Sequence, residues 1–450
     1  MSHTVIELND RAIRVSDSSG LLLQSPGFAL ADGEEIFLGE KAEKQARLKP
    51  TQSYNKYWHE LSLDPINHGN SFRHNADIAF AHLQHLADEE AIDGDVILAV
   101  PGSFTRQQLA ILLGLTEHCE FNVVGMVDSA LAASIAEASS AQSYNIVYAD
   151  LQLHQAVLTR LNTEGQQLSA GSTVQIPGVG SENFMDLMMQ MATRMFIQQC
   201  RFNPQHNAES EQQLYNELPG WLVQAQEGNL VLELKAGTTL HTAKMPYDSL
   251  VSSLKGHFGK INEQISALAK AADTQVLISP ALATLPGYEA SLAELTDMRV
   301  LDADVINTAC FQHLAAITHN PDGIQWVKAL PLAEQAAGKS RESLADKNMP
   351  THILFQNRAV PVNKVRIANS DSVNGHAVSA GTLTLSISGL PASLGRIEKR
   401  KDGVYFDSGE VQYLLNASSE TGEKKLSVGD RLHFQGSDDE LILIQVHDVQ

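Results

Sequence analysis

The sequence has few cysteines and no long apolar run. Its three cysteines, Cys119, Cys200 and Cys310, lie far apart and lack the spacing of structural zinc ligands. We therefore expect free thiols in a reducing, cytoplasmic environment rather than a disulfide framework. No apolar stretch reaches the roughly 18–20 residues of a membrane-spanning helix, so we expect no membrane insertion. The opening MSHTVIELND also lacks the basic and apolar regions of a secretory signal.

Positive charge is scarce as well. The chain has 32 lysines and arginines against 53 aspartates and glutamates, which gives a net charge of −21. Such a balance disfavours binding to nucleic acid or to an anionic membrane surface. With 450 residues, the chain is too long for one ordinary core, and we expect more than one domain.

Residues 1–333 alternate apolar strands with amphipathic helices, which is typical of an α/β protein. GDVILAVPGSF, for example, predicts a buried strand that ends at Pro101 and Gly102. A helix should follow it, with Thr105 as the N-cap and Gln108 at the capping-box position.

The composition changes at residues 334–350, which are polar, small and poor in β-branched residues. We expect a linker there. Residues 351–450 contain short alternating segments separated by Gly, Asp and Asn, such as GTLTLSISG and ELILIQVHDV. This pattern predicts an all-β domain of about 100 residues.

The stretch YNIVYADLQLHQAVLTRL, residues 144–161, combines a strand, an acid at Asp150, a short turn and a returning strand. A hairpin of this kind can bind phosphate when glycines follow the acid, because backbone N–H groups can then approach the anion. Here the turn consists of Gln152, Leu153, His154 and Gln155 instead. The stretch therefore indicates a phosphate hairpin without its glycines.

The order of these segments resembles the nucleotide-binding domain of DnaK-type heat-shock chaperones, in the actin-like ATPase superfamily. The resemblance is carried by VILAVPGSFTRQQLAILLGLTEHCEFNVVGMVDSALAAS, EIFLGEKAEKQARLKPTQSYNKYW and IPGVGSENFMDLM. It implies an α/β, actin-like two-lobed ATPase fold with two ribonuclease-H-like subdomains, followed by an all-β sandwich. The alternative is another α/β protein with a chance Val-Pro match.

The resemblance implies a site for ATP or ADP with Mg²⁺, and five side chains match its charged or turn positions. Glu7 stands for the acid of the first strand, and Asn9 could adopt the left-handed conformation of the family's glycine. Lys56 matches a lysine that reaches the transferred phosphate, and Asp128 matches an acid that holds the water shell of the metal. Asp150 matches the acid of the second hairpin.

The glycine turns of the family are less well preserved. Gly178 and Gly180 remain near the expected cleft, but Ser279 and Pro280 replace the two glycines of the adenosine-binding turn. Proline offers no N–H and fixes φ, so the backbone is poorly suited to approach a nucleotide there. Because phosphoryl transfer needs metal, water and phosphate positioned together, we expect weak or absent hydrolysis and assign no catalytic residue and no direct metal ligand.

Two resemblances describe residues 351–450. HILFQNRAVPV, residues 352–362, is similar to the start of the peptide-binding β-sandwich of DnaK-type chaperones. The later part, with residues 394–396 (LGR) and 429–430 (GD), is similar to forkhead-associated domains, which bind phosphothreonine. Either resemblance implies that this domain binds a protein partner or a client peptide.

Two functional hypotheses follow. In the first, the chain is an accessory chaperone, adaptor or assembly scaffold that binds proteins and hydrolyses ATP weakly or not at all. In the second, it is an active ATP-dependent switch that couples lobe closure to the β-domain. A filament-forming relative of actin is a third alternative, disfavoured by the appended β-domain.

Overall fold

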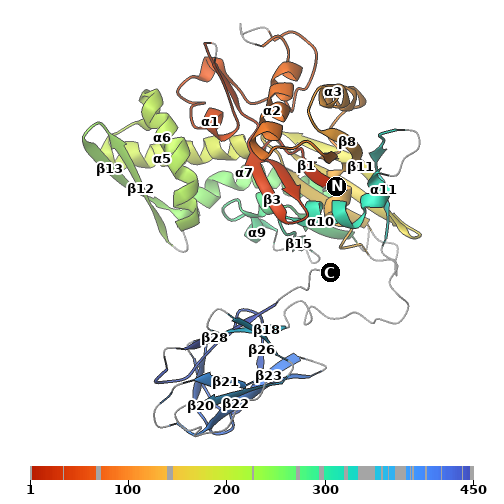
Figure 1. The fold of residues 1–450 in the computed structure, drawn as a ribbon. Coiled ribbons are helices and arrows are strands. Elements are labelled where there is room, and N and C mark those ends of the chain that lie inside the picture. Colours follow the sequence, from red (N-terminus) through yellow and green to blue (C-terminus); the bar gives the residue numbers. More distant parts are fainter. Residues whose placement is uncertain are drawn as a thin grey trace. The chain divides into compact units, whose positions relative to one another are not determined.

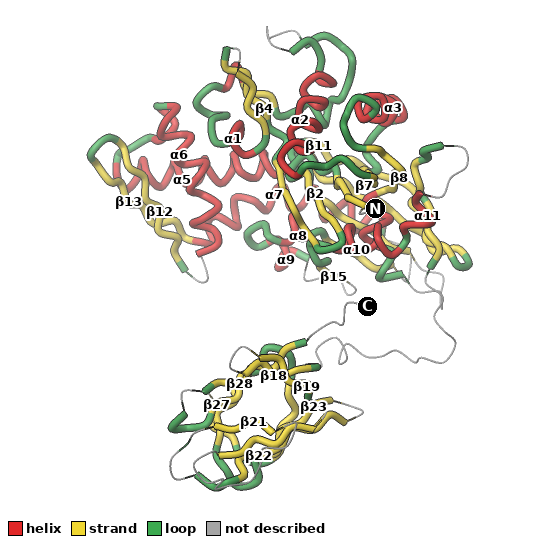
Figure 2. Tube along the Cα trace, viewed as in Figure 1, coloured by secondary structure: helices red, strands yellow, loops and turns green. Residues whose placement is uncertain are grey.

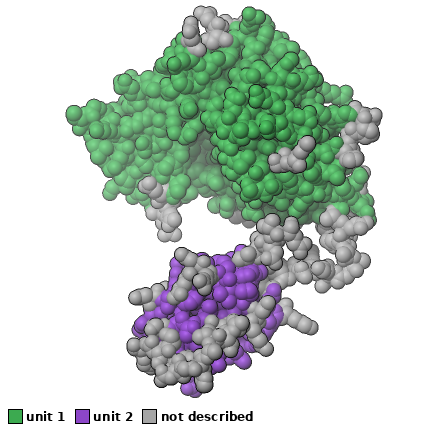
Figure 3. All heavy atoms as spheres, in the orientation of Figure 1, with its two compact units in different colours: residues 1–334 green, residues 335–450 purple. Residues whose placement is uncertain are grey.

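A computed structural model describes two compact units, residues 1–334 and 335–450 (Figure 3). Within residues 3–332 it describes all but 34, 67–71, 139–144, 225–227, 270–273, 293–297 and 319–322. Within residues 350–445 it describes all but 356–357, 363, 370–381, 386, 388–389, 401–402, 417 and 438. Apart from Pro350, the expected linker at residues 334–350 lies outside the described residues.

The first unit is built around two six-stranded sheets (Figures 1 and 2). In the first sheet, β1 pairs parallel with β7, which pairs parallel with β8, while β2 and β3 extend the other side antiparallel. Its order is β16 (Trp326–Val327), β8 (Asn122–Asp128), β7 (Asp95–Val100), β1 (His3–Glu7), β2 (Ile13–Asp17) and β3 (Gly20–Ser25).

The second sheet repeats this plan. There β9 pairs parallel with β14, which pairs parallel with β15, while β10 and β11 follow β9 antiparallel. Its order is β15 (Met298–Val300), β14 (Thr274–Ile278), β9 (Asn145–Leu151), β10 (Gln155–Glu164), β11 (Gln167–Pro177) and β17 (Ala329–Pro331). Five strands of each sheet therefore share one order and one set of directions.

Helices cover the outer face of each sheet and fill the space between the sheets. Strand residues alternate between two cores, as Val5 and Ile6 show on β1, because successive side chains point to opposite faces. Outside the first sheet lie α2 (Asn75–Glu90) and α3 (Arg106–Thr116); outside the second lie α5 (Ser181–Cys200) and α7 (Tyr247–Leu268). Between the sheets lie α4 (Ser129–Ser134) and α10 (Val305–Gln312).

Smaller elements complete the first unit. Near the first sheet are α1 (Glu40–Glu43), η1 (Pro50–Gln52) and a small sheet of β4 (Ala29–Asp32), β5 (Glu35–Leu38) and β6 (Ser53–Tyr54). Packed with α5 are η2 (Pro204–His206), α6 (Ala208–Gln224), β12 (Asn229–Ala236) and β13 (Thr239–Pro246). The remaining helices are α8 (Pro280–Ala283), α9 (Tyr288–Ser291) and α11 (Leu314–Thr318).

The second unit is made of strands in two sheets around one core, as the alternating pattern predicted. One sheet has the order β19 (Arg358–Pro361), β18 (His352–Phe355), β28 (Glu440–Ile444), β27 (Arg431–His433), β24 (Tyr413–Leu415) and β25 (Ser418–Glu420). The other has the order β21 (Thr382–Leu385), β20 (Lys364–Asn369), β22 (Ser393–Arg400), β23 (Gly403–Asp407) and β26 (Glu423–Leu426). The first strand of the unit thus pairs with its last.

Several local predictions are confirmed. Thr105 caps α3: its hydroxyl accepts a hydrogen bond from Gln108 N, and the Gln108 side chain accepts one from Thr105 N. The cysteines are free, with Cys310 buried and the other two half-buried. Across the described residues, no helix is both long and apolar enough to cross a bilayer.

Candidate functional site

The first strands of the two sheets end beside each other, which brings two predicted site residues together. Glu7 is the last residue of β1, and Asp150 lies one residue before the end of β9. Asn9, two residues after the end of β1, connects this strand end to β9: its Nδ2 donates to Asp150 Oδ2 over 2.9 Å and to Leu151 O over 3.1 Å. Asp10 adds a second link, because its Oδ1 accepts a 2.8 Å hydrogen bond from Leu153 N. The two turns are therefore bonded directly to each other.

The expected left-handed conformation of Asn9 is wrong. Among the described non-glycine residues, a positive φ occurs at Ala91, Arg201 and Asn416. Asn9 instead contributes through its side chain, whose Oδ1 also accepts from Arg11 N over 3.0 Å. The Asn9 side chain thus forms hydrogen bonds with Asp150, Leu151 O and Arg11 N, and a glycine at this position would leave these three groups open to a ligand.

Burial dominates the electrostatics at this junction. Loss of solvent, followed by the Asp150 charge, raises the pKa of Glu7 to about 8, and Arg14 at 3.7 Å opposes the shift. Burial also raises the pKa of Asp150, against hydrogen bonds from Ser279 and Asn9. Within the described part of the chain, no three His, Cys, Asp or Glu side chains are grouped to hold a metal ion.

Asp128 belongs to the same neighbourhood. Burial, followed by the charges of Asp150, Glu7 and Asp128, raises the pKa of Tyr148 on β9 well above its ordinary value. Asp128 itself caps α4, since its Oδ1 accepts from the N–H groups of Ala130 and Leu131. Its Oδ2 is buried without a partner among the described residues, and burial raises the pKa of the carboxyl to about 6.

The space around Glu7 and Asp150 is small. A cavity of about 90 Å³ is lined by these two residues, Asn9, Arg11 and Ser279, among others, whereas pockets for ligands of nucleotide size usually exceed roughly 300 Å³. Arg11 also lines a neighbouring cavity of about 530 Å³. Arg11 therefore borders both spaces.

Gly178 and Gly180 hold the chain against the hairpin turn that follows Asp150. Gly178 adopts φ +71°, and its N–H donates to His154 O over 3.1 Å. Gly180 immediately precedes α5, and a Cβ on it would overlap the backbone of Leu153 and Gln155. Gly178 is therefore favoured by its left-handed backbone conformation, and Gly180 by its close approach to the hairpin turn.

The first amides of α5 are likewise satisfied by the protein. A helix N-terminus with free N–H groups is a natural anion site. Here Ser181 N donates to Gln152 O over 2.9 Å, and Glu182 N donates to Leu153 O over 3.0 Å. The hairpin turn, which the resemblance implies should bind phosphate, therefore supplies the carbonyl acceptors for the first amides of α5.

The predicted adenosine turn is also used internally. Ser279 caps the short helix α8, which begins at Pro280. Ser279 N donates to Ala149 O over 2.9 Å, and its Oγ accepts from Leu282 N over 3.4 Å. Serine and proline here start a helix rather than open the backbone to a ligand.

Lys56 does not line the cavity around Glu7 and Asp150. Its side chain is 59% exposed, and its Nζ is 4.0 Å from Glu60 Oε1. The next two residues are buried: Tyr57 Oη lies 2.7 Å from His82 Nδ1, and Trp58 Nε1 donates to the same nitrogen over 3.3 Å. Because these aromatic rings occupy the core, Lys56 is directed to solvent.

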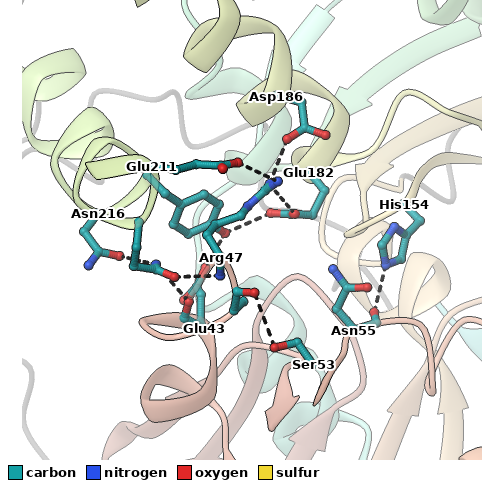
Figure 4. A network of polar contacts seen from close by, with 12 residues as sticks. Glu43, Arg47, Ser53, Asn55, His154, Glu182, Asp186, Glu211 and Asn216 are labelled. Carbon is teal, nitrogen blue, oxygen red and sulfur yellow. Dashed lines mark hydrogen bonds and ion pairs between the residues drawn. The ribbon is translucent and has the colours of Figure 1, made fainter. Parts of the chain in front are cut away.

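A network of polar contacts joins the α1 region to α5 and α6, and we call it the latch (Figure 4). Arg47 donates to Asp186 Oδ1 over 2.7 Å and to Glu182 Oε2 over 3.2 Å, and it lies 4.0 Å from Glu211. Its guanidinium also lies 5.2 Å from the centre of the Tyr215 ring. The latch consists of Glu43, Arg47, Glu182, Asp186, Glu211, Gln212 and Tyr215.

Gln212 and Tyr215 extend the latch toward α1. Gln212 accepts a 2.7 Å hydrogen bond from Arg47 N and donates to Glu43 O over 3.2 Å. Burial raises the pKa of Glu43 and of Glu182, and Arg47 is the principal group that opposes the shift at Glu182. The latch therefore closes one side of the 530 Å³ cavity, whose lining includes Glu43, Glu182 and Tyr215.

In the second unit, the residues that carried the forkhead-associated likeness lie in a strand and in a turn. Arg396 lies within β22 rather than in a loop, 3.7 Å from Asp407 on the neighbouring strand. Gly429 adopts φ +89°, and Asp430 Oδ2 accepts from Ser427 N over 2.8 Å, which makes a turn. Residues 370–381, which precede β21, lie outside the described residues.

The latch was not anticipated from the sequence. Arg47 and Glu182 are 135 residues apart, and Glu43 and Tyr215 are 172 apart. No local spacing rule connects such pairs.

Comparison with models of known protein families finds none that matches this chain, and comparison with curated proteins finds no match either.

Proposed function

We propose that residues 1–333 form a two-lobed, actin-like unit of the DnaK type whose nucleotide cleft no longer binds nucleotide. The repeated order of five strands in each sheet supports this proposal, because two ribonuclease-H-like subdomains would produce it. The placement of α4 and α10 between the sheets supports it as well.

One observation is the main support for the proposal that the cleft does not bind nucleotide. Backbone N–H groups that would cradle phosphate donate instead to the carbonyl groups of Gln152, Leu153 and His154. A phosphate would have to displace hydrogen bonds already made within the protein, and each buried group left without a partner costs about 1–3 kcal/mol. Loss of three such bonds would offset most of the affinity of a nucleotide.

The charges around the larger cavity argue in the same direction. Its lining carries Glu40, Glu43 and Glu182 against the single cation Arg11. A triphosphate would meet repulsion there, because like charges in a poorly solvated site destabilise each other. In an ATPase whose lobes are closed by nucleotide, Mg²⁺ and phosphate connect the two lobes. In this protein, the latch would make that connection instead.

We propose that the protein acts as an accessory chaperone, adaptor or assembly scaffold that binds polypeptide. A cavity of about 720 Å³ near Trp58 supports this role, since its polar lining combines the acids Asp10, Glu60 and Asp64 with many side-chain amides and hydroxyls: Asn75, Ser103, Thr105, Gln107, Gln108, Gln152, Gln155 and Gln175. Neutral amides match the donors and acceptors of a peptide backbone. The β-sandwich of the second unit is a further candidate for contact with a protein partner.

Calorimetric titration with ATP and ADP, with and without Mg²⁺, tests the first part. We expect no heat of binding and no thermal shift at 1 mM nucleotide, which corresponds to binding weaker than about −4 kcal/mol. A Ser279→Gly, Pro280→Gly double variant is the matched comparison, and we expect it to remain silent because the α5 amides stay occupied. Binding of the wild-type protein tighter than about 100 μM, roughly −5.5 kcal/mol, would overturn the proposal and favour the ATP-dependent switch.

Fluorescence anisotropy of a labelled, permanently unfolded polypeptide tests the second part. We expect binding whose affinity and release rate are unchanged by ATP. No binding of the unfolded chain would exclude the chaperone role, and release accelerated by ATP would again favour the switch.

A further inference from the structure

Three oxygen atoms of the latch form a short chain. Tyr215 Oη lies 2.9 Å from Glu43 Oε1 and 2.8 Å from Glu182 Oε1. Both separations are normal for O–H···O hydrogen bonds, and the Tyr215 side chain is buried. The three residues come from α1, α6 and α5, so the chain crosses the boundary that the latch closes.

This chain needs two hydrogens, but the phenol supplies only one. A tyrosine hydroxyl can donate to one carboxylate, and an ionised carboxylate can only accept. We propose that Glu43, Tyr215 and Glu182 together bind one additional proton, and that this proton closes the latch between the α1 region and α5–α6. The inference goes beyond the proposed function, because it concerns proton binding and not nucleotide or polypeptide.

The neighbouring charges place the proton on Glu43. Glu182 is paired directly with Arg47, which favours its ionised form, and Asp186 is the other acid near it. Glu43 makes no ion pair within 4 Å among the described residues. The charges that act on Glu43 are Arg11 and Lys44, which favour ionisation, and Glu40, which opposes it.

The order of donation follows from this placement. The Glu43 carboxyl donates to Tyr215 Oη, and the Tyr215 hydroxyl donates to Glu182, which also accepts from Arg47. Loss of the proton leaves Glu43 and Glu182 both charged on either side of a single hydroxyl. One of the two short contacts must then break.

The direction of the pH effect follows from the raised pKa of Glu43. A group whose pKa is raised in the closed state stabilises that state at low pH and ceases to do so as pH rises through the raised value. The latch should therefore be tightest near the ordinary glutamate value of 4.5 and should loosen above it. At the steepest part, its opening equilibrium should change about tenfold per pH unit.

Hydrogen exchange of the full-length protein without nucleotide tests the proposal. The readout is the protection of amides in residues 40–49 and 208–224 between pH 5 and 8.5, corrected for intrinsic exchange rates. We expect protection in the wild-type protein to fall as pH rises. Glu43→Gln should retain protection across this range, because glutamine donates to Tyr215 Oη without ionising.

Two further variants separate proton binding from general damage. Tyr215→Phe keeps the ring but removes the central oxygen, so we expect lower protection at pH 5 and a shallower pH dependence. Glu217→Gln neutralises an exposed glutamate on the same helix and should behave like the wild type. A wild-type protein without pH dependence, or a Glu43→Gln variant with the same pH dependence as wild type, would overturn the proposal whatever the nucleotide titrations show.

Discussion

Asn9 donates a 2.9 Å hydrogen bond to Asp150, and this contact joins the first strand of one sheet to the first strand of the other. The two residues are 141 positions apart in the chain. Here an amide side chain makes the connection directly.

We expect Asn9→Ala to destabilise the first unit by about 1–3 kcal/mol, because Asp150 Oδ2 and Leu151 O would lose their shared donor in a buried setting. Urea unfolding at pH 7 measures the change. Asn229→Ala is the control, since Asn229 is exposed at the start of β12, and its effect should stay within about 0.5 kcal/mol. Equal stabilities of the two variants would contradict a structural role for the Asn9 contact.

Gly180 separates the N-terminus of α5 from the turn after Asp150. We expect Gly180→Ala to destabilise the protein by about 1–3 kcal/mol, because its Cβ would overlap the backbone of Leu153 and Gln155. Gly256→Ala on α7 is the matched substitution, since a Cβ there meets nothing within 4 Å. It should stabilise the protein by about 0.5–1 kcal/mol through helix propensity. Thermal unfolding that ranks the two variants in the opposite order would disprove the close packing at Gly180.

Local sequence rules predicted the elements well but the site only in part. Strand periodicity, the Thr105 cap and the alternation of residues 351–450 are properties of neighbouring residues, and the structure contains each of them. Resemblance placed Glu7, Asp128 and Asp150 near one another, and they do lie around Tyr148.

Resemblance could not show what fills the space between these acids. The partner of Asn9 is fixed by the meeting of two sheets, and the partners of Arg47 are fixed by the packing of α5 and α6. Lys56 is a clear example of the limit. Its neighbours Tyr57 and Trp58 are held in the core, which turns the lysine outward irrespective of the motif that surrounds it.

The pKa of Glu7, raised to about 8, predicts that folding stability declines with rising pH. The protonated carboxyl is favoured in the folded state, so its contribution is full below about 4.5 and is lost as pH rises toward 8. One such proton gives a slope of up to about 1.4 kcal/mol per pH unit. Urea unfolding of wild type and Glu7→Gln at pH 5, 6, 7 and 8 should show a smaller decline in the variant. Parallel curves would show that Glu7 ionises normally in the folded protein.

The lowered pKa of His82 predicts that folding stability also declines as the pH falls into the acidic range. Because the Trp58 indole can only donate, His82 Nδ1 must be the unprotonated acceptor, and Nε2–H donates to Ser25 Oγ over 2.8 Å. A proton on Nδ1 would break the contact to Trp58 and would force the Tyr57 hydroxyl to accept instead of donate. Burial, with a smaller contribution from His85, lowers the pKa of His82 to about 3. A depressed folded pKa gives full stability above the ordinary value of 6.5 and a loss as pH falls below it, with a slope of up to about 1.4 kcal/mol per pH unit.

We therefore expect wild-type stability to drop between pH 6.5 and pH 4 and expect His82→Gln to be less stable at pH 7 but flatter over this range. Urea unfolding across the range measures both effects, with the exposed His206→Gln as the control that should follow wild type. A His82→Gln variant with the wild-type acid slope would mean that another group causes the acid sensitivity. In that case, the hydrogen bonds that neutral His82 Nδ1 accepts would not be what holds Tyr57 and Trp58 in the core. The outward direction of Lys56 would then need another cause.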